Sequence, residues 1–341
     1  MASTGSDSSA KRRRRLPLSL IFGSVLAVVG VAFVVVKISQ QWSQVRHSLA
    51  HVSVGWLVLG VLLATVGMVA IALAWRPVLV ALGAPHVSRA TVIRWYFVGE
   101  IGKYVPGGIW SVAGRSELSS RRGGMPRSAA YGSVALSLFL LEIGAAIVAA
   151  VAIPFSGIEH KHPIAWLVIL LLPVGLAVLH PRVLSASLRG ASKAARRELS
   201  VPIPDYRVML RLIAGYVPAW FAIGGGTWAI ARSLDPHAPF GNVFTAAVIS
   251  WIVGFLLVPV PGGVGVREGA FTALVSLPKG IAATAAILAR LAFMLVDGGG
   301  AVLAPLLLRD RTAERAATEA SEPDDPVAPT SDGAPRVETA S

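Results

Sequence analysis

Six runs of apolar residues, each of about 20 residues or more, constrain the fold more than any other feature of this sequence. A helix of about 20 residues crosses a hydrocarbon layer of about 30 Å. Over the whole chain, 54% of the residues are hydrophobic and only 14% are charged, which is outside the range of soluble proteins. We therefore expect an all-α polytopic membrane protein. The predicted spanning helices are Leu16–Val36, Gly55–Trp75, Ser128–Ile153, Pro163–His180, Val208–Arg232 and Gly280–Leu308.

Two further apolar segments, Arg89–Val105 and Asn242–Val260, lead into stretches that would interrupt a helix. Both stretches read Val-Pro-Gly-Gly, at 105–108 and at 260–263. Proline removes a backbone donor and glycine allows positive φ angles, so we expect a helix break at each site. Broken backbone at membrane depth is tolerated where protein or a water-filled cavity surrounds it. We expect both segments to be re-entrant, entering the membrane and returning to the same side.

The two broken segments are related to each other. A shift of 155 positions superimposes the two motifs and also places Val98-Gly99 on Val253-Gly254 and Glu142 on Asp297. The predicted repeat units are residues 89–153 and 242–308. Three predicted spans lie between the two breaks, and an odd number of crossings reverses the second unit. We therefore expect an inverted-topology repeat, which is typical of secondary transporters.

The distribution of basic residues predicts the orientation of the chain. In the re-entrant arrangement, 23 of the 31 Lys and Arg residues lie on the side of the termini and five on the other side. Cytoplasmic loops carry the excess of positive charge, so we expect both termini to be cytoplasmic in a multi-pass protein of the cell membrane. This topology also accounts for the net charge of +13 without a nucleic-acid partner. Residues 1–15 form a basic segment, 16–308 the membrane domain, and 309–341 a polar tail that we expect to be disordered.

The two breaks predict a site for an anionic group. A helix that restarts after the glycines presents unpaired N–H groups and the positive end of its dipole, which favours phosphate. Arg115, which follows the first break, could bind phosphate through two N–H groups. Arg267 and Glu268 directly follow the glycines of the second break. The alternative is that each motif is only a tight turn. The candidate substrate-binding residues are Pro106, Gly107, Gly108, Arg115, Glu117, Pro261, Gly262, Gly263, Gly265, Arg267 and Glu268.

Three ionisable residues, Glu142, Arg290 and Asp297, lie within the predicted spans. A charge in the middle of a spanning helix costs at least about 2.5 kcal/mol, so such residues usually line a cavity or find a partner. We predict that all three line a cavity, and the alternative is an interhelical ion pair or hydrogen bond. Glu100 and Lys103 are three residues apart on one helix face and are spaced to pair with each other.

Other site classes find no support in the sequence. The chain contains no cysteine, which excludes disulfides and cysteine nucleophiles. It also lacks the P-loop, the G-x-S-x-G and H-E-x-x-H motifs and the dinucleotide-binding fingerprint. We expect no cofactor and no metal.

The two broken stretches resemble the signature segments of the lysylphosphatidylglycerol synthase transmembrane-domain family, a flippase-like family of integral membrane proteins. The more specific signature, P-G-G-x-G-x-R-E-G, is matched at Pro261–Gly269, and the earlier one is matched by Pro106, Gly107, Arg115 and Glu117. The resemblance covers roughly Leu16–Leu308. In two-domain members a soluble aminoacyl transferase follows the membrane region, and we expect no such domain in this chain of 341 residues.

The resemblance and the predicted repeat imply a lipid flippase or transporter and not an enzyme. It would move the head group of a phospholipid, a glycolipid or a polyprenyl phosphate, with the phosphate held at the paired breaks. Its partners would be membrane lipids with anionic or zwitterionic head groups. The alternative is an accessory subunit of a lipid-modifying transferase, or such a transferase itself. Glu117 and Glu268 are the obvious bases for an enzyme, but their predicted positions on opposite faces argue against a single catalytic centre.

Overall fold

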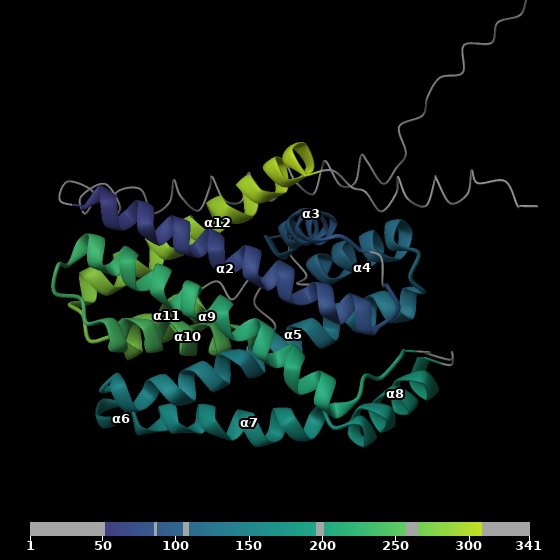
Figure 1. Ribbon diagram of the computed structural model, residues 1–341. Helices are drawn as coiled ribbons and strands as arrows, with labels where there is room; N and C mark the ends of the chain where they lie inside the picture. The colour runs from purple at the N-terminus through teal and green to yellow at the C-terminus, as the bar shows by residue number, and fades with distance from the viewer. Residues whose placement is uncertain (1–51, 85–86, 105–108, 196–200, 257–264, 309–341) are drawn as a thin grey trace, which may run out of the picture.

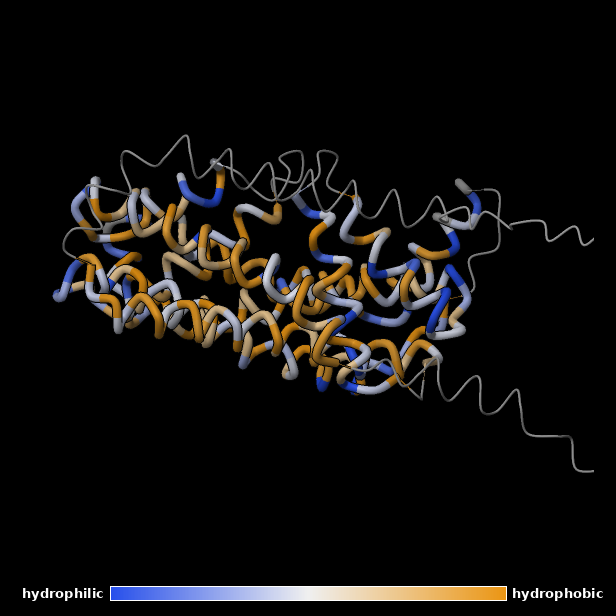
Figure 2. The backbone as a smooth tube through the Cα atoms, turned by 90° about the horizontal axis from the view of Figure 1, so that it is seen from above, coloured by the Kyte–Doolittle hydropathy of each residue, from blue (hydrophilic) through white to orange (hydrophobic). Residues whose placement is uncertain are grey.

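The computed structural model describes residues 52–84, 87–104, 109–195, 201–256 and 265–308, and within these ranges its regular elements are all helices. Four helices in these ranges are long and apolar enough to cross a membrane, and they match four of the predicted spans. They are α2 (Val54–Ala81), α5 (Arg127–Ala152), α9 (Tyr206–Leu234) and α12 (Lys279–Leu307), which form an elongated bundle (Figure 1). Hydrophobic residues predominate over the bundle as a whole (Figure 2).

The two remaining predicted spans differ from these four. Leu16–Val36 lies outside the described residues. Pro163–His180 does not form one long helix, because it is divided between the 3₁₀ turn η3 (Pro163–Trp166) and the 12-residue helix α7 (Leu167–Val178). A bend of 75° then leads from α7 into α8 (Pro181–Ala195). Pro181 lacks the N–H that would continue α7, so a new helix begins there. The described residues therefore contain four spans, or five if α7 and α8 cross together.

The first broken segment is a helical hairpin. α3 (Arg89–Glu100) continues into the 3₁₀ turn η1 (Ile101–Tyr104), and α4 (Trp110–Gly123) runs back along it. Glycines allow this close approach, since a Cβ atom on Gly102 would lie 2.5 Å from the carbonyl carbon of Trp110. α4 is followed by Gly124, whose φ of +66° is the left-handed conformation common at helix ends.

The second broken segment is also a hairpin. It consists of α10 (Phe240–Leu256) and α11 (Val266–Leu274), which pack against each other. α11 begins after Gly265, whose φ is +81° and whose N–H donates to Oε2 of Glu268 at 2.7 Å. This bond satisfies a donor at the start of α11, as in a capping box. The short elements η2 (Ile153–Phe155) and α6 (Ile158–Lys161) connect α5 to η3.

The long helices are held by close contacts between small residues and by hydrogen bonds between buried side chains. α2 packs on α9 so closely that a Cβ atom on Gly60 would lie 2.5 Å from the Ile230 side chain. Between α5 and α9, the Tyr216 hydroxyl donates to Oγ of Ser137 and Nε1 of Trp220 donates to the carbonyl of Leu141, both at 2.8 Å. The matching order of these contacts makes α5 and α9 parallel.

The two hairpins begin at opposite ends of the bundle (Figure 1). α3 and α4 connect the end of α2 to the start of α5, whereas α10 and α11 connect the end of α9 to the start of α12. The amide of Asn242 donates to the carbonyl of Ser156 at 3.3 Å, so α10 begins where α5 ends. Each hairpin therefore enters the bundle from its own end.

Candidate functional site

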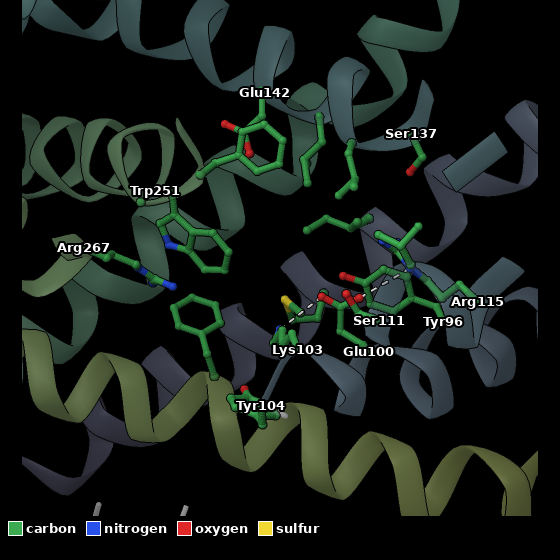
Figure 3. Close-up of a pocket in the computed structure, with 18 of the residues that line it drawn as sticks. Tyr96, Glu100, Lys103, Tyr104, Ser111, Arg115, Ser137, Glu142, Trp251 and Arg267 are labelled. Carbon is green, nitrogen blue, oxygen red and sulfur yellow. Dashed lines mark ion pairs between the residues drawn. The ribbon is translucent and has the colours of Figure 1, made fainter. Parts of the chain in front are cut away.

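A cavity of about 310 Å³, which we call the central cavity, lies between the two hairpins and the helices α2, α5 and α12 (Figure 3). Its wall includes Met68 of α2, Glu142 of α5 and Phe293 of α12. Each of these residues lies near the middle of its helix. The central cavity is therefore halfway along the apolar helices, at the depth where a polar group is most costly to expose to lipid.

Both hairpins reach the central cavity at their broken ends. Tyr104 and Ile109 flank the first motif and line the cavity, and Phe255 and Arg267 do so near the second. Most of the predicted motif positions lie outside the described residues. These are Pro106, Gly107, Gly108, Pro261, Gly262 and Gly263.

Lys103 joins the first hairpin to α12. Its Nζ lies 2.7 Å from Oδ2 of Asp297 and 3.3 Å from Oε1 of Glu100, as the spacing of the latter pair predicts. The Tyr104 hydroxyl also donates to Asp297, at 2.5 Å. Asp297 is fully buried, outside the cavity lining, and meets the cavity through Lys103 and Tyr104. These contacts are those of an interhelical ion pair, which the sequence analysis gave as the alternative to a place in the cavity wall.

Arg115 lies in the wall of the central cavity and is only 2% exposed. Its Nε lies 3.6 Å from Oε2 of Glu100, and its guanidinium carbon lies 5.3 Å from the ring centre of Tyr96 and 5.7 Å from that of Trp75. The carboxylate and the two rings together offset the cost of burying this cation. Glu100 therefore joins Lys103 and Arg115 in one ionic network (Figure 3).

Arg267 faces the same cavity from the second hairpin but has a different environment. Its guanidinium carbon lies 3.5 Å from the ring centre of Trp251 and 5.1 Å from that of Phe293. Within the described ranges no carboxylate forms an ion pair with it. The negative faces of the rings stabilise the cation but leave its N–H groups available.

The two predicted glutamates that follow the breaks lie away from the central cavity. Glu268 accepts a hydrogen bond from Arg290, which lines the cavity, and so ties α11 to α12. Glu117 pairs instead with Arg121 at 2.8 Å and Arg127 at 3.3 Å, near the end of the first hairpin. Neither carboxylate is in the cavity wall.

Glu142 lines the central cavity on the side opposite Glu100 and Lys103 (Figure 3). Its Oε2 is buried and has no hydrogen-bond partner among the described residues. In those same ranges no Lys or Arg lies within ion-pair distance of its carboxyl group. Glu142 is thus an unpartnered acid in the middle of a predicted membrane span.

The two hairpins share a three-residue arrangement that the sequence analysis missed. In the first, Arg115 packs against Gly99 and over the ring of Tyr96. In the second, Arg267 packs so closely against Gly254 that a Cβ atom on this glycine would lie 3.3 Å from Cβ of Arg267, and its guanidinium lies over the ring of Trp251. The shift of 155 that aligns the two motifs places Tyr96 on Trp251 and Gly99 on Gly254. The same shift was therefore the signal that could have identified these aromatic residues.

A family model described as the lysylphosphatidylglycerol synthase TM region matches residues 20–298. This match includes both hairpins and every charged residue of the central cavity. The chain belongs to this family. The resemblance of the two motifs is thereby confirmed, and family membership indicates a multi-pass membrane protein with a lipid-related function. A comparison with curated proteins gave no match.

Proposed function

We propose that this protein is a lipid flippase or transporter, not an enzyme, and that it moves a lipid head group across the cytoplasmic membrane. The head group would belong to a phospholipid, a glycolipid or a polyprenyl phosphate. The observation that carries the proposal is the central cavity, which places cations from both hairpins halfway along the apolar helices. A polar head group needs such contacts where hydrocarbon would otherwise surround it.

In this proposal the two hairpins form an inverted-topology repeat. Two features support it: the hairpins enter from opposite ends of the bundle, and each packs an arginine over an aromatic ring and against a glycine. Inverted repeats give alternating access when one repeat moves against the other around a fixed site. The head group would then be reached from one side through the first hairpin and from the other side through the second.

We place the phosphate of the head group at the two Pro-Gly-Gly motifs. The described residues beside both motifs line the central cavity, which supports this position. Arg267 supports it further, because aromatic rings are its neighbours and its N–H groups can form two parallel bonds to a phosphate. Membrane lipids with anionic or zwitterionic head groups are the proposed cargo, and both termini of the chain are proposed to be cytoplasmic.

The experiment is a transport assay in vesicles. The purified full chain is reconstituted with a small fraction of lipid that carries a dye on its acyl chain, and a membrane-impermeant reductant bleaches the dye on the outer leaflet. The panel of labelled lipids covers phosphatidylglycerol, an aminoacylated phosphatidylglycerol, a neutral glycolipid and a polyprenyl phosphate. We expect at least one of them to be bleached beyond the outer-leaflet fraction when the protein is present.

Two variants separate transport from leakage. Arg267→Gln removes the available cation and should slow the movement of that lipid. Glu159→Gln is the matched control, because Glu159 lies outside the cavity and pairs with His160 at 3.1 Å. If no lipid of the panel moves faster than in protein-free vesicles, the transport proposal fails. The accessory role beside a lipid-modifying transferase would then take its place.

A further inference from the structure

Glu142, an acid, and Arg267, a base, line the same cavity and do not pair with each other. Arg267 is stabilised by two rings, but Glu142 has no comparable contact in the described ranges. An ionised carboxylate that is buried without a partner is costly, and such a group is neutralised by a proton instead. Arginine does not respond in this way, since it stays charged in proteins.

The elements packed against α5 do not supply a free cation for Glu142. α7 and α10 contain no titratable residue. The nearest titratable groups on α4 and α9 are engaged, since Arg115 pairs with Glu100 and Tyr216 donates to Ser137. On α2, Nε of Arg76 donates to the carbonyl of Val87 at 2.8 Å. The segments 105–108 and 257–264 lie between cavity-lining residues in the sequence, and neither contains a titratable residue.

When Glu142 is left out, the described residues around the central cavity carry one more positive than negative charge. Each of three carboxylates pairs with at least one cation, and Arg267 is the cation of this set that has no carboxylate partner. The cations are Lys103, Arg115, Arg267 and Arg290, and the carboxylates are Glu100, Glu268 and Asp297. A neutral Glu142 therefore gives a net charge of +1, which matches the single negative charge of a phosphodiester. An ionised Glu142 gives zero.

We propose that Glu142 is a proton-binding site of the central cavity and that an anionic head group binds together with one proton. The proton comes from water on the side to which the cavity is open and forms an O–H bond with the Glu142 carboxylate. Below the pH at which Glu142 ionises in the empty protein, the proton stays on the carboxyl group; above that pH, it returns to water on the other side when the head group leaves. The inference has the consequence that lipid movement is coupled to proton movement, and this consequence rests on the proposed transport function.

The first measurement concerns Glu142 alone. Infrared spectra of the solubilised full chain are recorded at neutral pH for the wild type and for Glu142→Gln, and their difference isolates the carboxyl group of Glu142. We expect a protonated-carboxyl band that is present in the wild type, absent from Glu142→Gln and retained in Glu159→Gln. A spectrum in which Glu142 contributes only carboxylate bands would overturn the inference, whether or not the protein moves lipid.

The second measurement concerns coupling. The probe is dihexanoyl phosphatidylglycerol, a water-soluble lipid with one phosphodiester, and binding is followed by tryptophan fluorescence because Trp251 lines the cavity. Above the pH at which Glu142 ionises in the empty protein, wild-type affinity should fall by up to about tenfold per pH unit, because one proton is taken up with the probe. Glu142→Gln should bind with no such dependence, and Glu159→Gln should behave as the wild type.

The outcomes of these measurements distinguish this inference from the proposed function. If Glu142→Gln keeps the wild-type pH dependence, or if the probe does not bind at any pH, the coupling of proton and phosphodiester is wrong. The vesicle assay then decides separately whether lipids move. Conversely, a protonated Glu142 and pH-dependent binding in a protein that moves no lipid would retain the proton site and contradict the transport function.

Discussion

Lys103 at the broken end of the first hairpin lies 2.7 Å from Asp297 in the middle of α12, and this ion pair joins two elements that are far apart in the sequence. Asp297 is fully buried and Lys103 is largely buried. The intact pair itself adds little net stability, but removing Lys103 would leave the Asp297 carboxylate buried without a cation.

We predict that Lys103→Met lowers the free energy of unfolding by about 3–5 kcal/mol, because the buried Asp297 carboxylate loses its cation. Thermal unfolding in detergent, followed by tryptophan fluorescence, measures this effect. Adding Asp297→Asn to the Lys103→Met variant should recover much of the loss, since the double variant buries no unpaired charge. Equal stability of Lys103→Met and the wild type would contradict this role for the pair.

The contact between the two arms of the first hairpin gives a steric prediction. Gly102→Ala should destabilise the protein by about 1–3 kcal/mol, because the new methyl group would overlap the backbone at Trp110. The matched control is Gly298→Ala in α12, where a Cβ atom would meet nothing within 4 Å. That change should be neutral or stabilise the helix by up to about 1 kcal/mol. Similar melting temperatures for both variants would show that the hairpin arms are less closely packed than described.

The environment of Arg267 predicts a difference between two substitutions. Arg267→Lys keeps the charge but loses the planar group that lies on the Trp251 ring, at an expected cost of about 1 kcal/mol in head-group binding, or roughly fivefold. Arg267→Gln removes the charge as well and should reduce the transport rate further. The dye-lipid assay measures both rates, and unfolding curves establish that both variants are folded. Wild-type transport by Arg267→Gln would exclude this residue from the phosphate site.

The arrangement of the hairpins is tested by labelling. The chain contains no cysteine, so single cysteines can be introduced without a background. Pro126 before α5 and His237 before α10 are both exposed and lie at the outer ends of the two hairpins. A membrane-impermeant maleimide should label Pro126→Cys only from the cytoplasmic side and His237→Cys only from the outside. Labelling of both from one side would refute the inverted repeat.

The long helices could be predicted from sequence because their signal is local. The predicted span Gly55–Trp75 lies within α2, and Ser128–Ile153 coincides with α5 to within one residue at each end. Pro163–His180 was a less accurate prediction, since an apolar run alone does not reveal that residues 163–166 form a 3₁₀ turn and that the following helix has only 12 residues. The pairing of Glu100 with Lys103 was also predictable from their spacing of three residues.

The rest of the site depends on contacts between residues that are distant in sequence. Asp297 stood out as a buried acid, but nothing in its own helix indicated Lys103 as its partner. Glu268 was assigned to substrate, whereas Arg290 from α12 binds it in the structure. Trp251 and Phe293 passed unnoticed, because an aromatic residue in an apolar helix is ordinary until a cation is found on its ring.

The close packing of α2 on α9 has a mechanical consequence. Gly60 lies against Ile230, and Gly67 lies against Ile223, where a Cβ atom would be 2.8 Å from the side chain. Sliding one helix past the other would bring larger side chains into these two contacts, so the pair resists any change of register. In the proposed transport cycle, α2 and α9 would then serve as a fixed frame, and the displacement that opens the cavity to either side would fall to the hairpins and their ion pairs.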